Sequence, residues 1–162
     1  MNDDPEVLRR IVGKALSGKD AHVEAGNALA GFDWRLAGER PAGAPHSVFQ
    51  LVNHMIYWQE WVLRWLGGRT PPVPKHAAGS WPGAIGPASR VRWEQTVRRF
   101  RAGVTKLERH ARGGDLESGR AGKSRLEMLQ IIGAHNSYHA GQAAILRQML
   151  GRWPPPGGGV TW

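Results

Sequence analysis

Apolar side chains recur at spacings of three and four residues in four long stretches of the chain, and this spacing predicts α-helices. No stretch shows an alternation of apolar and polar residues that would predict a strand. The sequence therefore predicts an all-α fold, a four-helix bundle that forms a single domain over residues 1–162. The predicted helices cover approximately residues 5–16, 47–66, 87–111 and 124–150.

Two of the predicted helices begin with a capping signal. Ser47 is followed three residues later by Gln50, and Ser124 is followed at the same distance by Glu127. In such a capping box the serine and the residue three positions on satisfy each other's backbone N–H groups. Both pairs therefore predict a helix start.

The pattern before residue 30 predicts two helical pieces. The first piece is expected to turn one apolar face inward, made of Val7, Leu8, Ile11 and Val12. Gly18 interrupts this pattern. A second piece is predicted over residues 19–29, with Asp20 as its N-cap.

Two segments rich in proline and glycine are predicted to be irregular. Residues 67–88 contain five prolines, and long loops within a compact domain are often functional. This loop is expected either to roof a site or to be a solvated connector. Residues 153–162 form an irregular C-terminal tail, for which Trp162 is the candidate anchor.

Three histidines occupy apolar stripes of the predicted helices. His135 and His139 are four residues apart, so their imidazoles lie on one side of a helix. His54 lies on a different predicted helix. The stripe of the last helix is Met128, Ile132, His135, His139, Gln142, Leu146 and Met149, and that of the second long helix is Leu51, His54, Trp58, Trp61 and Trp65.

Inward histidines from two helices of a bundle are a typical way to build a metal site. The sequence predicts that His54, His135 and His139 bind one divalent metal ion and leave positions for water or a substrate. Because the chain has no cysteine, its metal ligands must be nitrogen or oxygen atoms. The alternative is that the three are core histidines satisfied by hydrogen bonds, which would require three separate partners in an apolar interior.

Further side chains are candidates for the same site. Gln142 could orient water or a ligand, or make a packing contact. Tyr138 could donate a proton or a hydrogen bond, or lie at the boundary of the core. His22 is the candidate for an additional ligand. His46, His76 and His110 are expected to be exposed, because they lie in loops or at a helix end.

The charge balance changes this interpretation little. The formal net charge is +9, from 22 Lys and Arg against 13 Asp and Glu. Such a charge admits anionic partners, but no nucleic-acid-binding motif accompanies it, and nucleic acid is not an expected partner. The start of the chain lacks the order of a signal peptide, and no apolar run approaches the roughly 18 residues that span a bilayer. We expect a cytoplasmic protein without a membrane partner.

Several segments together resemble the DinB/YfiT-like superfamily of four-helix-bundle proteins. They are LVNH at 51–54, HNSYHAGQ at 135–142 and LRQMLGRWP at 146–154, with GKDAHVEAGNALAG near the start and WP at 81–82. The resemblance implies a divalent metal, usually zinc or nickel, held by His54, His135 and His139. It also implies a homodimer packed through helices.

The resemblance further implies thiol-dependent chemistry, because characterised relatives include transferases that use a low-molecular-weight thiol. Others are hydrolases, and many have no known activity. Since the chain has no cysteine, a thiolate would have to come from a cosubstrate, and a metal would lower the pKa of a bound thiol or water. The leading hypothesis is a metal-dependent thiol S-transferase. The alternatives are a metal-dependent hydrolase and a non-catalytic, stress-related metal-binding protein.

Overall fold

The computed structural model describes residues 5–159, which form an all-α fold dominated by four long helices. This confirms the predicted fold class and the positions of the four long helical stretches. A short helix, α2 (Ala25–Ala28), lies in the sequence between the first and the second of these long helices. The long helices are α1 (Pro5–Ser17), α3 (Val48–Leu66), α4 (Arg90–Arg112) and α5 (Arg125–Met149).

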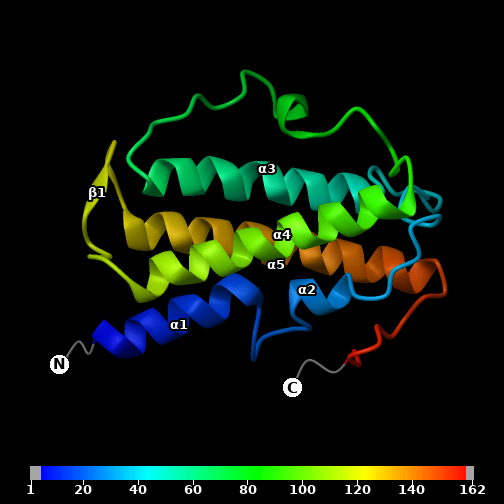
Figure 1. Cartoon of the computed structure of the whole chain (residues 1–162), viewed down its shortest axis with the longest axis horizontal. Helices are drawn as coiled ribbons and strands as arrows, with labels where there is room; N and C mark the ends of the chain where they lie inside the picture. Colours follow the sequence, from blue (N-terminus) through cyan, green and yellow to red (C-terminus); the bar gives the residue numbers. More distant parts are fainter. Residues whose placement is uncertain (1–4, 160–162) are drawn as a thin grey trace.

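The long helices pack in a closed ring. α1 lies between α4 and α5, and α3 lies between the same two helices on the other side. Figure 1 shows that α1 and α5 run in one direction and that α3 and α4 run in the opposite direction. The pairs α1–α5 and α3–α4 are therefore parallel neighbours, while α3 is antiparallel to α5.

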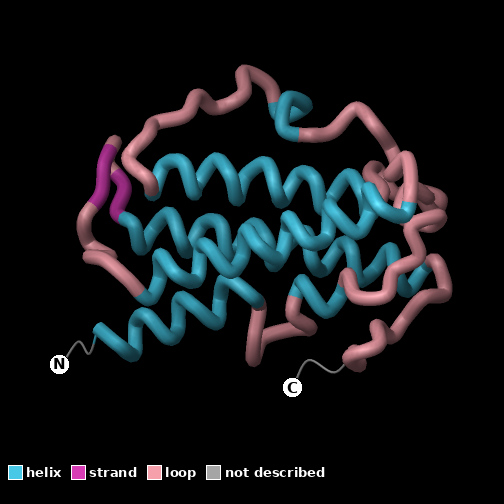
Figure 2. The backbone as a smooth tube through the Cα atoms, in the orientation of Figure 1, coloured by secondary structure: helices cyan, strands magenta, loops and turns pink. Residues whose placement is uncertain are grey.

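This direction of α4 explains the long loop before it. Because α3 and α4 are parallel, the chain must return along the whole length of α3, about 28 Å for its 19 residues. Residues 67–89 make this return as a loop that arches over α3 (Figure 2) and contains one short 3-10 helix, η1 (Ala77–Ser80). The topology thus requires a segment that can cover one face of α3.

Both predicted capping boxes are formed. The Ser47 hydroxyl accepts a hydrogen bond from the backbone N–H of Gln50, and the Gln50 side chain accepts one from the backbone of Ser47. Ser124 and Glu127 make the same reciprocal pair at the start of α5. These local bonds explain why the beginnings of α3 and α5 could be predicted.

The prediction of a second helical piece over residues 19–29 is wrong for most of its length. Gly18 has a φ of +84° and Asp20 a φ of +67°, so the chain turns here instead of continuing a helix. Asp20 forms an ion pair with Lys14 and caps no helix. A Cβ on Gly18 would lie 2.0 Å from the His22 ring, so this turn requires glycine.

The predicted inward face of α1 is also wrong in part. Val12 and Leu16 are buried, but Ile11 is 55% exposed, and Val7 and Leu8 are exposed as well. Arg9 occupies the inward side one turn before Val12. Its guanidinium donates to the carbonyls of residues 111, 112 and 114 at the end of α4. Arg9 thus makes the contact with α4 in these first turns, while Val7, Leu8 and Ile11 are exposed.

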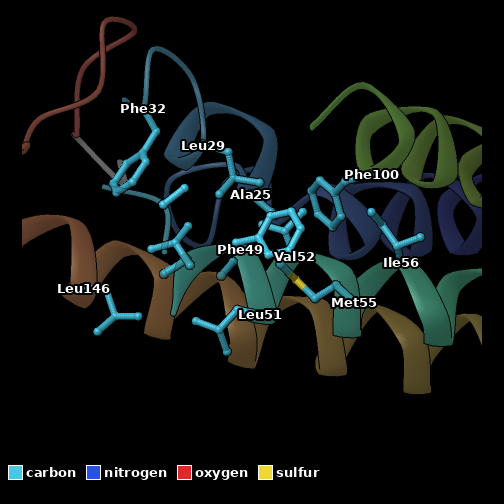
Figure 3. Packing of buried hydrophobic residues seen from close by; sticks show 14 of the residues in the cluster. Ala25, Leu29, Phe32, Phe49, Leu51, Val52, Met55, Ile56, Phe100 and Leu146 are labelled. Atoms are coloured by element: carbon cyan, nitrogen blue, oxygen red, sulfur yellow. The ribbon is translucent and has the colours of Figure 1, made fainter. Parts of the chain in front are cut away.

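The core consists of two apolar clusters along the bundle. Figure 3 shows the cluster in which Phe100 of α4 meets Val52 and Met55 of α3. The second cluster includes Leu16, Leu107 and Leu129 at the other end of the bundle. The predicted stripes of α3 and α5 face these clusters, except that Met149 is 55% exposed and lies outside the core.

The remaining segments are short. Residues 119–124 form a hairpin of two two-residue strands, β1 (Gly119–Arg120) and β2 (Lys123–Ser124). The C-terminal tail contacts the α2 region, where Asn27 donates to the Gly158 carbonyl. The proposed anchor Trp162 lies outside the described residues. Within residues 5–159, no helix has both the length and the apolar character needed to cross a bilayer.

Candidate metal centre

The three histidines of the predicted site converge between α3 and α5. One nitrogen of each imidazole lies within 4.8 Å of the corresponding nitrogens of the other two. The Nε2 atoms of His54 and His135 are 3.2 Å apart. Two nitrogens bound tetrahedrally to one ion at about 2.1 Å would lie roughly 3.4 Å apart. The spacing of these two atoms therefore fits ligands that share one ion.

Hydrogen bonds orient two of these imidazoles. His54 donates from Nδ1 to the carbonyl of Ser80, at 3.2 Å. His139 donates from Nδ1 to Oε1 of Gln142, at 2.7 Å. A carbonyl oxygen can only accept, so the proton must be on Nδ1 and the lone pair on Nε2. Both rings thus leave Nε2 as the nitrogen available to a metal ion, an arrangement common among metal-binding histidines.

The third imidazole lacks such a partner in the part of the chain that the structure describes. Nδ1 of His135 is buried without a hydrogen bond, and so are both polar side-chain atoms of Asn136 beside it. Asn136 lies close enough to raise the pKa of His135 but makes no well-aligned hydrogen bond with it. A small side-chain rotation that joins the two would complete the set of Nδ1 partners.

The surroundings keep the imidazoles neutral at pH 7. Burial, with smaller contributions from the imidazoles of His139 and His46, lowers the pKa of His54 to about 4, although the hydrogen bond to Ser80 acts in the opposite direction. Burial, together with His139 and His54, likewise lowers the pKa of His135 to about 4. The pKa of His139 is also lowered by burial. Neutral imidazole is the form that binds metals, so the apolar setting favours coordination.

An aromatic wall covers the His54 side of the centre. The Trp81 indole stacks on His54, with ring centroids 3.9 Å apart and planes 5° apart. His46 stacks on the same indole at 3.6 Å and 11°. At these distances two imidazoles cannot stack on the same face of one indole, so Trp81 lies between His46 and His54. Trp58 makes edge contacts with His54 and His135 from the other side.

The 67–89 loop contacts the centre directly. Ser80 and Trp81 both belong to it, and both contact His54. The loop is also joined to α3 by a hydrogen bond from Trp61 Nε1 to the Pro72 carbonyl, at 3.1 Å. Of the two predicted roles, a roof over the site is the one that the structure supports.

The sequence predicted no place at the centre for His46 or for Trp81, although Trp81 belongs to the family resemblance. His46 was expected to be exposed, but it is half-buried against Trp81, and burial lowers its pKa. Both residues lie in irregular segments, where no periodicity indicates which way a side chain points. His110 is also half-buried, beside Arg125, contrary to expectation, whereas His76 is exposed as predicted.

The other candidate residues take different positions. Gln142 contacts the centre by holding His139. Tyr138 packs its ring against His139 but is 66% exposed, so it is not among the buried groups of the centre. His22 does not join the three histidines. Its Nδ1 bonds the Val23 carbonyl and its Nε2 the Ser137 hydroxyl, which occupies both ring nitrogens.

One side of the centre is open. His135 lines a cavity of about 550 Å³ between α3 and α5, under the 67–89 loop. A cavity of similar volume, about 560 Å³, lies elsewhere along α4 and is lined by exposed arginines but by none of the three histidines. Of these two cavities, the one at His135 gives a small molecule access to the centre.

Comparison with known families gives one match. Residues 26–143 match the DinB superfamily, and this stretch contains His54, His135 and His139. No curated protein and no solved structure matches the chain.

Proposed function

The chain belongs to the DinB superfamily, and from this premise we propose that it is a metal-dependent enzyme. In this proposal His54, His135 and His139 hold one divalent transition metal ion, zinc or nickel being the expected ones. The enzyme activates a small thiol cosubstrate for transfer to an electrophile. The observation that carries the proposal is the convergence of three neutral imidazoles beside an open cavity.

The open side favours catalysis over a purely structural role. Structural sites usually surround the ion with four protein ligands, whereas catalytic sites use three and leave a position for a substrate atom. The group of possible ligands contains three histidines and, among the described residues, no carboxylate or further histidine joins it. This composition matches the catalytic pattern.

The same composition favours a thiol over water. An ion held at this centre would act as a Lewis acid that lowers the pKa of a thiol or water bound there. The pKa of a thiol is about 8.5 and that of water lies far higher, so a bound thiol ionises much more readily than bound water. Metal-dependent hydrolases such as the zinc metalloproteases usually add a glutamate as general base. Among the described residues, no carboxylate lines the cavity beside His135.

The side chains around the centre have defined parts in this proposal. Ser80 and Gln142 hold His54 and His139 with Nε2 directed at the ion. Trp58 and Trp81 limit the access of water to the His54 side. Exclusion of water strengthens electrostatic interactions at the centre and protects a reactive thiolate.

The test uses metal-loaded protein, a panel of small thiols and 1-chloro-2,4-dinitrobenzene as electrophile. In this reaction a carbon–sulfur bond forms, the carbon–chlorine bond breaks, and the thiol loses its proton. We expect turnover that requires metal and thiol together, is lost in His139→Ala and is retained in His76→Ala, which alters an exposed histidine.

Two other outcomes would contradict the proposal. Cleavage of 4-nitrophenyl acetate without any thiol, combined with no thiol transfer, would replace the transferase with a hydrolase. Metal binding without either activity would leave a non-catalytic metal-binding protein.

We also propose that the chain forms a homodimer through α5. Ile131, Tyr138, Ile145 and Met149 are 47–66% exposed and follow one stripe of the helix at spacings of seven, seven and four residues. An exposed apolar stripe of this kind favours helix-to-helix packing. Sedimentation analysis should give a dimer that Ile145→Arg dissociates; a monomer at all concentrations would contradict this.

A further inference from the structure

The cavity beside His135 has a lining that indicates which molecules fit it. Its walls come from α3, α5, the 67–89 loop and the β1–β2 hairpin. Three indoles and two prolines give it broad apolar surfaces. The lining residues of the aromatic side and roof are Trp58, Trp61, Trp65, Pro71, Pro72 and Val73.

The aromatic surfaces are continuous with the metal centre. Trp58 contacts both His135 and Trp61 through its ring, with centroids 6.3 and 6.1 Å away. Aromatic rings favour stacked or edge contacts with other aromatic rings, in addition to the gain from burying apolar area. A flat aromatic ligand would therefore find contacts along the cavity up to the imidazole of His135.

Positive charge lies at the opposite end of the cavity. Lys123 of β2 lines it, and Arg120 of β1 lies over the Trp65 ring, 5.4 Å from its centroid. Among residues 5–159, no carboxylate contributes to the lining. Lys123 also acts electrostatically on Glu127, whose carboxylate is engaged by Ser124. This end of the cavity suits an anionic group on a ligand.

We propose that this cavity binds an aromatic substrate that carries a carboxylate at the end remote from its reacting atom. The reacting atom lies at His135 and the carboxylate at Lys123. The cavity runs from β2 to His135 along the first part of α5, which rises roughly 15 Å over ten residues. The length of the Lys123 side chain reduces the distance that a ligand must span. The identification of the bound molecule as the substrate rests on the function proposed above. The preference of the cavity for aromatic carboxylates is independent of that function.

The experiment is calorimetric titration with 2-naphthoate and its neutral counterpart 2-naphthamide. We expect naphthoate to bind about fivefold more tightly, the scale of an exposed ion pair. Lys123→Met should remove this difference without changing the affinity for naphthamide. Lys106→Met, which alters an exposed lysine of α4, should preserve it. Trp61→Leu should weaken both ligands, and Trp34→Leu, at the arginine-lined cavity, should weaken neither.

Titrations of metal-free and metal-loaded protein separate the two proposals. If the protein takes up no metal but binds naphthoate, the cavity proposal is upheld and the proposed metal-dependent function is overturned. Metal uptake without binding of either naphthalene compound would overturn the cavity proposal alone. Equal affinity for the two ligands would refute the proposed contact between a ligand carboxylate and Lys123. Affinity that falls as the protein dimerises would show that a second copy fills the cavity, and would also refute the proposal.

Discussion

The hydrogen bond between His139 and Gln142 gives a quantitative test of the metal centre. At 2.7 Å, Nδ1 of His139 donates to the Gln142 amide oxygen, which leaves Nε2 as the nitrogen available to an ion shared with the other two histidines. Gln142→Leu keeps a side chain of similar size but removes the acceptor. The imidazole could then rotate, and its nitrogen would become a weaker ligand.

The expected loss follows from the role of such partners. Removal of a hydrogen-bond partner of a metal-binding histidine typically weakens metal affinity by about 10- to 100-fold. This corresponds to approximately 1.4–2.7 kcal/mol. The loss should be smaller than in His139→Ala, which removes a ligand altogether.

The assay is zinc competition against a chromophoric chelator at pH 7. The matched control is Gln148→Leu, which makes the same change at an exposed position of α5 and should leave affinity unchanged. Gln142→Glu restores an acceptor and should bind zinc at least as tightly as the wild type. Wild-type affinity in Gln142→Leu would refute the assignment of Nε2 as the ligand atom of His139.

Three further predictions concern stability. The metal-free protein should lose stability as pH falls from about 6.5 to 4. His54 and His135 have pKa values of about 4 in the folded protein, so these histidines bind protons at a higher pH in the unfolded chain. At pH 5 this difference should lower the free energy of unfolding by about 2 kcal/mol per histidine. A flat denaturation profile between pH 7 and 5 would contradict their burial as neutral groups. Arg147→Met should lower the free energy of unfolding by roughly 2–4 kcal/mol, because the buried guanidinium donates to three backbone carbonyls; Arg152→Met, at an exposed site, should not. Ser124→Ala should cost about 1 kcal/mol by removing the α5 cap, and an unchanged urea midpoint would argue against that cap.

Much of the fold could be predicted because its signals are local. The beginnings of α3 and α5 follow from capping boxes that involve residues three positions apart. The convergence of His54 with the other two histidines followed from helical periodicity, since each lies on a stripe that faces a neighbouring helix. Membership of the DinB superfamily was likewise visible in motifs around these histidines.

The failures arise where distant residues or unusual backbone angles decide the local structure. The inward face of α1 depends on Arg9, whose partners lie more than 100 residues away at the end of α4. The turn after α1 depends on positive φ angles at Gly18 and Asp20. Stacking of His46 on Trp81 joins two loops, and no spacing in either loop indicates this contact.

The most direct test of the central claim is the metal content of protein purified without a histidine tag or nickel resin. The measurement compares the wild type with His54→Ala, because His54 is the candidate ligand that α3 contributes to a centre otherwise built on α5. The account predicts about one equivalent of a divalent transition metal in the wild type and its loss in the variant. Wild-type protein that stays metal-free after incubation with zinc and with nickel would contradict the account.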